Sequence, residues 1–247
     1  VALLSWAIRY KKCCAGIMIT ASHNPTNYNG FKAYWDDGAQ LTSPTDEMVI
    51  QAYKDMKSFS EISYIDFEQG IQEGKIEWMD EDVEGPYYDM LMENVVRPDT
   101  LNEHGKNLKI VYTALHGTGL HAFERISKKI GCSDFEIVPE QAKPDSTFPT
   151  VTYPNPEYPE ALKLATQLLS KSAGDAAFGT DPDTDRLGVA YIKEGEIRYP
   201  NGNQIAALML DYVLSGLKEQ KRLPQDGYVI KTIVTSEVQQ AICDFTV

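Results

Sequence analysis

Short apolar runs alternate with longer amphipathic segments along most of this 247-residue chain, and that alternation limits its possible folds more than any other feature. Apolar runs of about five residues are typical of buried strands, whereas apolar residues at helical spacing indicate helices that bury one face. A chain that alternates the two is expected to form strand–helix units. We therefore predict an α/β protein.

The predicted elements follow directly from this pattern. Strands are expected at residues 16–20, 31–35, 108–114, 135–138, 175–179, 187–192 and 228–234. Helices are expected at residues 43–56, 87–96, 120–130, 159–172 and 204–216, with a further helix opening at Ser236. Ser43 is expected to cap the first of these helices, and Trp6, Trp35 and Trp78 are expected to be packing residues.

The length allows about two domains, at roughly 100–150 residues each. We place boundaries near residues 101 and 200, which gives segments 1–101, 102–200 and 201–247. The chain opens inside an apolar run and closes inside a helix that has barely begun. We therefore expect a fragment of a longer protein, with the last segment cut short.

Charge and composition narrow the classes of partner. The formal net charge is −13, so nucleic acid and anionic membranes are unfavourable partners because like charges repel. No apolar stretch reaches the roughly 20 residues that a membrane span needs. The four cysteines form neither a metal-site spacing nor a disulfide framework. We expect a cytoplasmic protein, and the oligomeric state is not indicated.

A first candidate site follows the strand at 16–20. It reads Thr-Ala-Ser-His-Asn-Pro at residues 20–25 and Asn-Gly-Phe-Lys at residues 29–32. Ser22 and His23 lie at the start of a polar loop, and the turn-forming residues after them would let Lys32 fold back toward Ser22. Judged by composition only, this is a surface turn.

A second candidate site reads Asp-Pro-Asp-Thr-Asp-Arg at residues 181–186. Asp181, Asp183 and Asp185 alternate along a loop between two apolar strands, so the loop could turn all three carboxylates toward one point. Clustered carboxylates repel one another unless a cation lies among them, and an all-oxygen ligand set favours Mg²⁺.

Other interpretations of this loop are weaker or remain open. An EF-hand would need glycine and glutamate where the chain has Arg186 and Ile192, so that interpretation fails. A magnesium-dependent phosphatase of the haloacid dehalogenase type comes closer, but it would have threonine where the chain has Asp185. A capped turn without metal also stays open.

The two motifs together resemble the α-D-phosphohexomutases, the group that contains phosphoglucomutase and phosphomannomutase. The turn His-Gly-Thr-Gly at residues 116–119 lies in a matching place. The resemblance implies repeated mixed-sheet α/β domains, truncated here to about two of the four in the family. Domain I would be incomplete at its N-terminus, domain II whole, and domain III only begun.

The resemblance also implies roles for the motif residues. Ser22 would carry a phosphoryl group, and one Mg²⁺ per active site would bind to Asp181, Asp183, Asp185 and a phosphate oxygen on Ser22. Arg186 would contact that phosphate, while Lys32 and His23 would assist proton transfer.

A phosphosugar substrate is implied, most simply glucose, interconverted between its 1-phosphate and 6-phosphate through glucose 1,6-bisphosphate as intermediate and activator. The family's sugar-selecting and distal phosphate loops are not found in these residues, so we expect little mutase activity from this polypeptide alone. A phosphatase and a non-catalytic phosphosugar-binding module are the alternative functions.

His116 and His121 flank the glycine turn at 116–119. We expect these side chains to satisfy local hydrogen bonds rather than to bind a ligand. The glycine pair in the turn is too short for a dinucleotide-binding fingerprint, because no third glycine follows at the required spacing.

Overall fold

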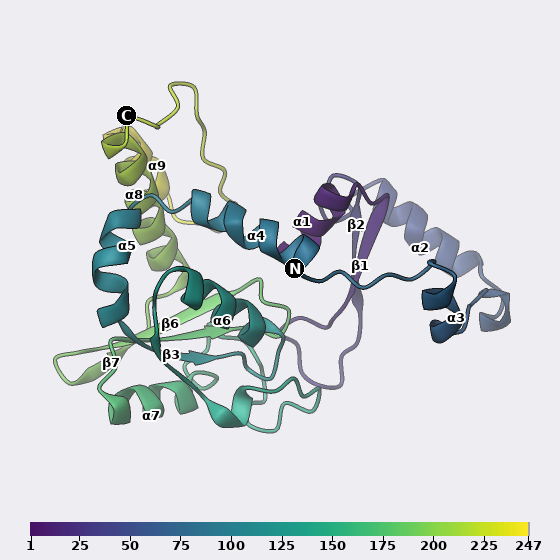
Figure 1. Cartoon of the computed structure of the whole chain (residues 1–247), viewed down its shortest axis with the longest axis horizontal. Coiled ribbons are helices and arrows are strands. Elements are labelled where there is room, and N and C mark those ends of the chain that lie inside the picture. Colours follow the sequence, from purple (N-terminus) through teal and green to yellow (C-terminus); the bar gives the residue numbers. More distant parts are fainter. Residues whose placement is uncertain (247) are drawn as a thin grey trace. The chain divides into compact units, whose positions relative to one another are not determined.

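The computed structural model describes residues 1–246 and divides them into two compact units (Figure 1). The first unit contains residues 1–20 and 30–90. The second contains residues 21–29 and continues from residue 91 to the end of the described chain. The loop at 21–29 therefore belongs to a different unit from the strands on either side of it.

The first unit is built on a two-stranded antiparallel sheet. Strand β1 (Ala15–Ile19) pairs with β2 (Phe31–Trp35), with Gly16 opposite Tyr34. The helices are α1 (Ala2–Lys11), α2 (Thr45–Asp55), α3 (Phe67–Gln72) and all but the last three residues of α4 (Glu81–Glu93), with a 3-10 turn at Phe59–Glu61. Gly16 lets α1 approach the sheet, because a Cβ at this position would lie 2.3 Å from Ile8 Cδ1.

The second unit is built on a mixed five-stranded sheet in the order β4-β3-β5-β6-β7. Its strands are β3 (Lys109–Thr113), β4 (Asp134–Ile137), β5 (Ala176–Thr180), β6 (Leu187–Lys193) and β7 (Glu196–Arg198). Strand β3 runs parallel to β4 and β5, whereas β6 is antiparallel to both β5 and β7. The mixed sheet predicted from the family resemblance is confirmed.

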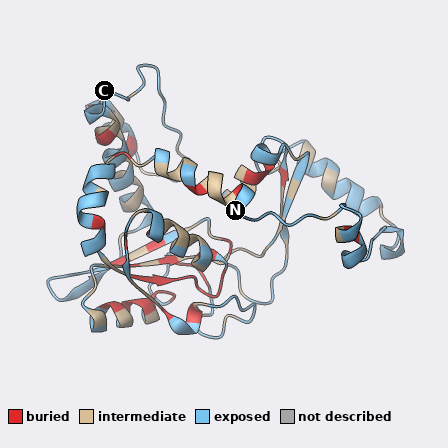
Figure 2. Cartoon of the chain, in the orientation of Figure 1, coloured by how far each residue is buried: buried red, intermediate tan, exposed pale blue. Residues whose placement is uncertain are grey.

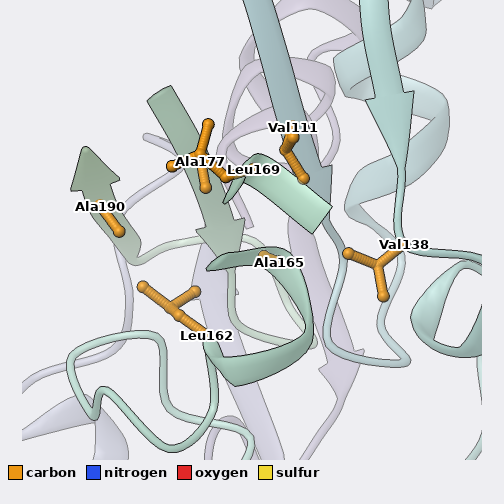
Figure 3. Close-up of a cluster of buried hydrophobic side chains, with 7 residues drawn as sticks. All are labelled: Val111, Val138, Leu162, Ala165, Leu169, Ala177 and Ala190. Carbon is orange, nitrogen blue, oxygen red and sulfur yellow. The ribbon is translucent and has the colours of Figure 1, made fainter. Parts of the chain in front are cut away.

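Neighbouring residues of β3 face opposite sides of this sheet, as the strand period requires. Val111 belongs to a core with residues of α7 (Lys163–Ser172), including Leu169, whereas Tyr112 stacks on Phe123 of α6 (Gly119–Lys129) at 4.0 Å between ring centroids. The two helices therefore cover opposite faces. The core residues are Val111, Val138, Leu162, Ala165, Leu169, Ala177 and Ala190 (Figure 3).

Burial follows this arrangement. Figure 2 shows buried residues concentrated along the central strands of the second unit, and Val111, Ala177 and Ala190 are fully buried there. The remaining helices of the unit are α5 (Pro98–His104), α8 (Gly202–Glu219) and α9 (Val238–Thr246), with 3-10 turns at Gly105–Asn107 and Pro139–Gln141. Helix α8 begins with a capping box between Asn201 and Gln204, which satisfies two orphan amide groups.

Some sequence expectations are wrong. Residues 228–234 form no strand, and their apolar side chains are exposed, with Ile233 at 97%. A β-strand needs a paired neighbour, and none of the described strands pairs with this segment. Ser43 does not cap α2. The residue before that helix is Pro44, and the Ser43 hydroxyl donates to Glu47 Oε1 at 2.8 Å instead.

Two helices have different starts from those predicted. Helix α4 begins at Glu81 and includes Pro86, and α7 begins only at Lys163, after turns at 159–162. Trp35 and Trp78 are largely exposed, at 49% and 75%, although Trp78 packs edge-on against Phe67 with 5.9 Å between the ring centroids. Among the described helices, none has both the length and the apolar character of a membrane span.

Candidate active site

The acidic loop, residues 181–186, is the turn of the hairpin between β5 and β6. Thr180 pairs with Leu187 across its base, so the whole motif lies between two paired strands. The loop closes on itself, because Thr184 adopts a left-handed backbone (φ 59°) and its amide donates to the Asp181 carbonyl at 3.0 Å. The hairpin holds the motif at the edge of the core.

Three carboxylates converge in this loop, as the alternating aspartates predict. One oxygen from each of Asp181, Asp183 and Asp185 lies within 4.8 Å of the others. Asp181 is fully buried, Asp183 is 3% exposed, and Asp185 faces solvent. A set of oxygen donors this close, two of them removed from water, fits a hard divalent cation such as Mg²⁺.

The carboxylate of Asp181 is held by the backbone of its own loop. Its Oδ1 accepts the amides of Asp185 at 3.0 Å and Arg186 at 2.9 Å, which folds the loop around the carboxylate. Burial, together with the neighbouring carboxylates of Asp183 and Asp185, raises the pKa of Asp181 to about 6, although the hydrogen bond from the Arg186 amide acts in the opposite direction. Ionising this carboxylate is therefore costly without a cation.

Ser22 lies beside the same carboxylate, although 159 residues separate it from Asp181. The Ser22 hydroxyl donates to Asp181 Oδ2 at 3.3 Å, and it lies 3.2 Å from His23 Nδ1. Ser22 has a left-handed backbone (φ 56°), an unusual conformation for a non-glycine residue. The loop at 21–29 thus brings a nucleophile to the acidic loop within one compact unit.

The surroundings of His23 favour its neutral form, although the carboxylates of Glu157, Asp183 and Asp185 oppose this effect. Partial burial lowers the pKa of His23, and the positive charge of Arg186 lowers it further. Arg186 also faces Glu157, with 3.8 Å between its NH1 atom and Glu157 Oε2. A neutral imidazole beside Ser22 can accept a proton, which is the property that a general base needs.

Lys32, Glu157 and the turn at 116–119 compare differently with the expectations from the sequence. Lys32 lies on β2 in the first unit, so its approach to Ser22 stays a prediction. Glu157 was missed, since it lies in a proline-rich segment whose composition gives no signal for a site. Sequence reasoning also gave the turn at 116–119 no role at the acidic loop.

The expectation for His116 is confirmed, since its Nε2 lies 2.8 Å from Thr150 Oγ1. Burial lowers the pKa of His116. The side chain is therefore part of a local hydrogen-bond arrangement.

Comparison with known proteins decides the family. The sequence model "Phosphoglucomutase/phosphomannomutase, alpha/beta/alpha domain I" matches residues 1–59, and the domain II model of the same family matches residues 86–194. Together these two ranges span more than half of the chain. This chain belongs to the phosphoglucomutase/phosphomannomutase family. The resemblance inferred from the two loops is thereby confirmed.

Relatives within the family agree on this assignment. A phosphoglucomutase of Staphylococcus saprophyticus is 37% identical over 240 residues, which are 97% of this chain and 42% of the relative. A phosphoglucomutase of Staphylococcus epidermidis is 35% identical over 243 residues, 98% of this chain and 43% of the relative. The chain thus spans about two fifths of the length of these curated relatives.

Solved structures of the family share the fold. Parafusin (phosphoglucomutase) from Paramecium, in an open form, has a TM-score of 0.62 and 18% identity, covering 98% of this chain and 46% of the other. A phosphoglucomutase/phosphomannomutase family protein from Burkholderia thailandensis has a TM-score of 0.50 and 26% identity, covering 81% of this chain and 38% of the other.

Proposed function

We propose that the full-length protein interconverts hexose 1-phosphate and hexose 6-phosphate, with glucose as the main sugar, and that Ser22 carries the transferred phosphoryl group. The observation that carries this proposal is the 3.3 Å approach of the Ser22 hydroxyl to Asp181 within a carboxylate cluster. The choice of glucose is supported by the two staphylococcal relatives, both phosphoglucomutases.

Asp181, Asp183 and Asp185 would hold one Mg²⁺ together with a phosphate oxygen on Ser22. When bound, the cation supplies positive charge that stabilises the phosphoryl group during transfer. Three carboxylates and a phosphoserine together carry a charge of about −5, and one Mg²⁺ would offset two of these negative charges. Arg186 follows directly in the loop and would contact the phosphate, which lowers the remaining repulsion.

The phosphoryl group on Ser22 would then be transferred to the substrate. A hydroxyl oxygen of the hexose monophosphate forms a bond to the phosphorus on Ser22, and the bond between that phosphorus and Ser22 Oγ breaks. The hydroxyl proton passes to a base and Ser22 Oγ takes up a proton, so the products are a hexose bisphosphate and unphosphorylated Ser22. The 3.2 Å distance between His23 Nδ1 and Ser22 Oγ supports a role for His23 in proton transfer at that oxygen, and Lys32 would assist at the sugar hydroxyl.

Isomerisation needs a second transfer in the opposite direction. The bisphosphate turns around in the site, and its other phosphate returns to Ser22. One serine and one cation site serve both transfers, because the two steps differ only in which sugar oxygen reacts. Glucose 1,6-bisphosphate is the expected intermediate for glucose, and it also activates the enzyme by phosphorylating Ser22.

The polypeptide of 247 residues alone should have little turnover. Its Ser22 and carboxylate cluster would serve phosphoryl transfer, whereas the family's sugar-selecting loops lie in later domains.

A cytoplasmic location is part of this proposal. All four cysteines are free thiols in the structure, which is compatible with a reducing compartment.

The intact mass of the full-length protein, before and after mixing with glucose 1,6-bisphosphate, tests the mechanism. We expect one phosphate adduct, which maps to Ser22. Ser22→Ala should abolish both the adduct and the mutase activity. No adduct at Ser22 would overturn the phosphoserine mechanism. Activity that survives Ser22→Ala but not Asp181→Asn would instead identify a phosphatase, and an unphosphorylated protein that binds phosphosugars without turnover would identify a binding module.

A further inference from the structure

The turn at residues 115–119, which we call the brace turn, lies directly against the acidic loop. The amide and the hydroxyl of Thr118 both donate to the Pro182 carbonyl, each at 3.0 Å. Thr118 Oγ1 also lies 3.5 Å from Thr184 Oγ1. The peptide that joins Pro182 to Asp183 is thus held from outside its own hairpin.

Gly117 makes this contact possible. A Cβ at residue 117 would lie 2.2 Å from Pro182 Cα and 2.6 Å from the Pro182 carbonyl oxygen, closer than real Cβ contacts occur. Gly117 does not adopt a left-handed backbone, so its glycine is needed for space rather than for conformation. Since the neighbouring atoms belong to the backbone, any side chain at residue 117 must move the acidic loop or the brace turn.

Gly119 repeats this requirement at the other end of the brace turn. Its Cβ would lie 2.3 Å from the Tyr112 hydroxyl, 2.5 Å from Thr180 Oγ1 and 3.1 Å from Thr184 Oγ1. Thr180 directly precedes the acidic loop. The two glycines therefore let one turn contact both the entry and the middle of the acidic loop.

A buried hydrogen-bond network holds the brace turn in place. Leu115 and His116 both adopt left-handed backbones (φ 46° and 61°), which non-glycine residues rarely do. The Leu115 amide donates to Thr113 Oγ1 at 3.1 Å, and the His116 amide donates to the Gln141 carbonyl at 3.1 Å. These partners restrain the unusual backbone.

The side chain of Gln141 connects the members of this network. Gln141 is fully buried; its Oε1 accepts from Thr113 Oγ1 at 2.6 Å and its Nε2 donates to Thr150 Oγ1 at 2.8 Å. Thr150 in turn contacts His116 Nε2 at 2.8 Å. Thr113, His116 and Gln141 are buried and hydrogen-bonded, whereas Thr150 lies at the exposed end of the network, so these bonds restrain the brace turn relative to β3.

We propose that the brace turn, through Gly117 and Thr118, is a positioning element that sets the backbone of the acidic loop so that its three carboxylates converge. The part of this inference that concerns a cation rests on the proposed function. Gly117 and Thr118 act through the Pro182 peptide and are positioning residues only.

Two readouts on the full-length, unphosphorylated protein test the proposal. Binding of Mn²⁺ alone, followed by its electron paramagnetic resonance signal, reports the geometry of the carboxylates. Hydrogen–deuterium exchange of a peptide that covers residues 181–186 reports the order of the metal-free loop, including the amides that donate to Asp181. We expect Gly117→Ala to weaken Mn²⁺ binding at least about tenfold and to speed exchange at least about tenfold.

Matched variants separate positioning from a general loss of stability. A Cβ at Gly202 would meet no atom within 4 Å, so Gly202→Ala should leave both readouts unchanged. Thr118→Val removes the hydroxyl that donates to Pro182 and should shift both readouts in the same direction as Gly117→Ala, by a smaller factor. Thr118→Ser keeps the hydroxyl and should behave like the wild type. If Gly117→Ala fails to fold, the difference between Thr118→Val and Thr118→Ser tests the positioning role instead.

The outcomes distinguish this inference from the proposed function. Wild-type Mn²⁺ binding and wild-type exchange in both Gly117→Ala and Thr118→Val would overturn the positioning role. A wild-type protein that binds no Mn²⁺ would contradict the proposed cation site, and the exchange of residues 181–186 alone would then support or overturn the inference.

Discussion

The guanidinium of Arg97 donates two hydrogen bonds to the carboxylate of Glu219, from Nε at 3.0 Å and from NH2 at 2.9 Å. Further bonds join Arg97 to the Tyr212 carbonyl and the Ser215 hydroxyl, and its guanidinium lies 4.6 Å from the centre of the Tyr212 ring. Arg97 thus fastens α8 to the segment that precedes α5. A two-pronged contact of this kind has better geometry than a typical surface ion pair.

Glu219→Gln should lower the urea midpoint of unfolding, because it removes the charge but keeps the shape of the side chain. Arg97 lowers the pKa of Glu219 below its ordinary value of 4.5, so the folded state favours the ionised carboxylate. This contribution is present above about pH 4.5 and is lost as the pH falls through the folded pKa. The difference between wild type and variant should therefore shrink in acid, and a difference that stays constant across this range would contradict the assignment.

Mg²⁺ should stabilise the full-length protein in a pH-dependent way. The pKa of Asp181, raised to about 6, means that the metal-free folded state binds more protons than the unfolded state between pH 3.8 and 6. The contribution of Asp181 to the stability of the metal-free folded state is fully present below pH 3.8 and is lost as the pH rises through about 6. A cation that binds the ionised cluster should therefore raise Tm strongly near pH 7.5 and only weakly near pH 5.

Thermal unfolding with and without Mg²⁺ measures this effect. Asp181→Asn should remove most of the response at both values of pH. An equal rise in Tm at both would show that the cation binds somewhere other than the acidic loop.

His23→Gln should slow the proposed mutase about 10²-fold in kcat, the scale of general acid–base catalysis. The lowered pKa of His23 keeps the imidazole neutral near pH 7, and its Nδ1 lies 3.2 Å from Ser22 Oγ. Mn²⁺ affinity should stay unchanged, since we assign His23 no part in holding the cation. Wild-type kcat in the variant would leave proton transfer to Lys32 or another group.

Leu169→Ala should lower the free energy of unfolding by about 2–5 kcal/mol, the range for emptying a packed core position. Leu169 is fully buried where α7 covers the sheet. Leu208 on α8 is 69% exposed, so Leu208→Ala serves as the control and should cost less than about 0.5 kcal/mol. Equal losses in the two variants, measured by urea unfolding, would contradict the location of the core.

The fold was predictable where an apolar segment has a neighbouring strand to pair with and a helix to pack against. The runs at 108–114 and 175–179 become β3 and β5 because they pair with each other and bury one face under α7. The run at 228–234 is also rich in apolar and β-branched residues, yet it forms no strand, since none of the described strands pairs with it. Composition alone does not reveal whether such a partner is present.

The candidate site was predictable in its parts but not in its contacts. Spacing within residues 181–185 indicated convergent carboxylates, and the structure brings them together. The meeting of Ser22 with Asp181 came from the family resemblance, since nothing local in either motif specifies a partner 159 residues away. The contact of Gly117 with Pro182 was missed because a requirement for empty space leaves no chemical signature in a sequence.

The hairpin that carries the acidic loop couples the length of that loop to the core. Thr180 pairs with Leu187, and Ala190, three residues further on, is fully buried beside Leu162. Because side chains alternate along a strand, an insertion between 181 and 186 that shifted β6 by one residue against β5 would turn Ala190 outward and Tyr191 inward. A change in the number of residues in the acidic loop therefore puts the packing of Ala190 against the core at risk, which a substitution within the loop does not.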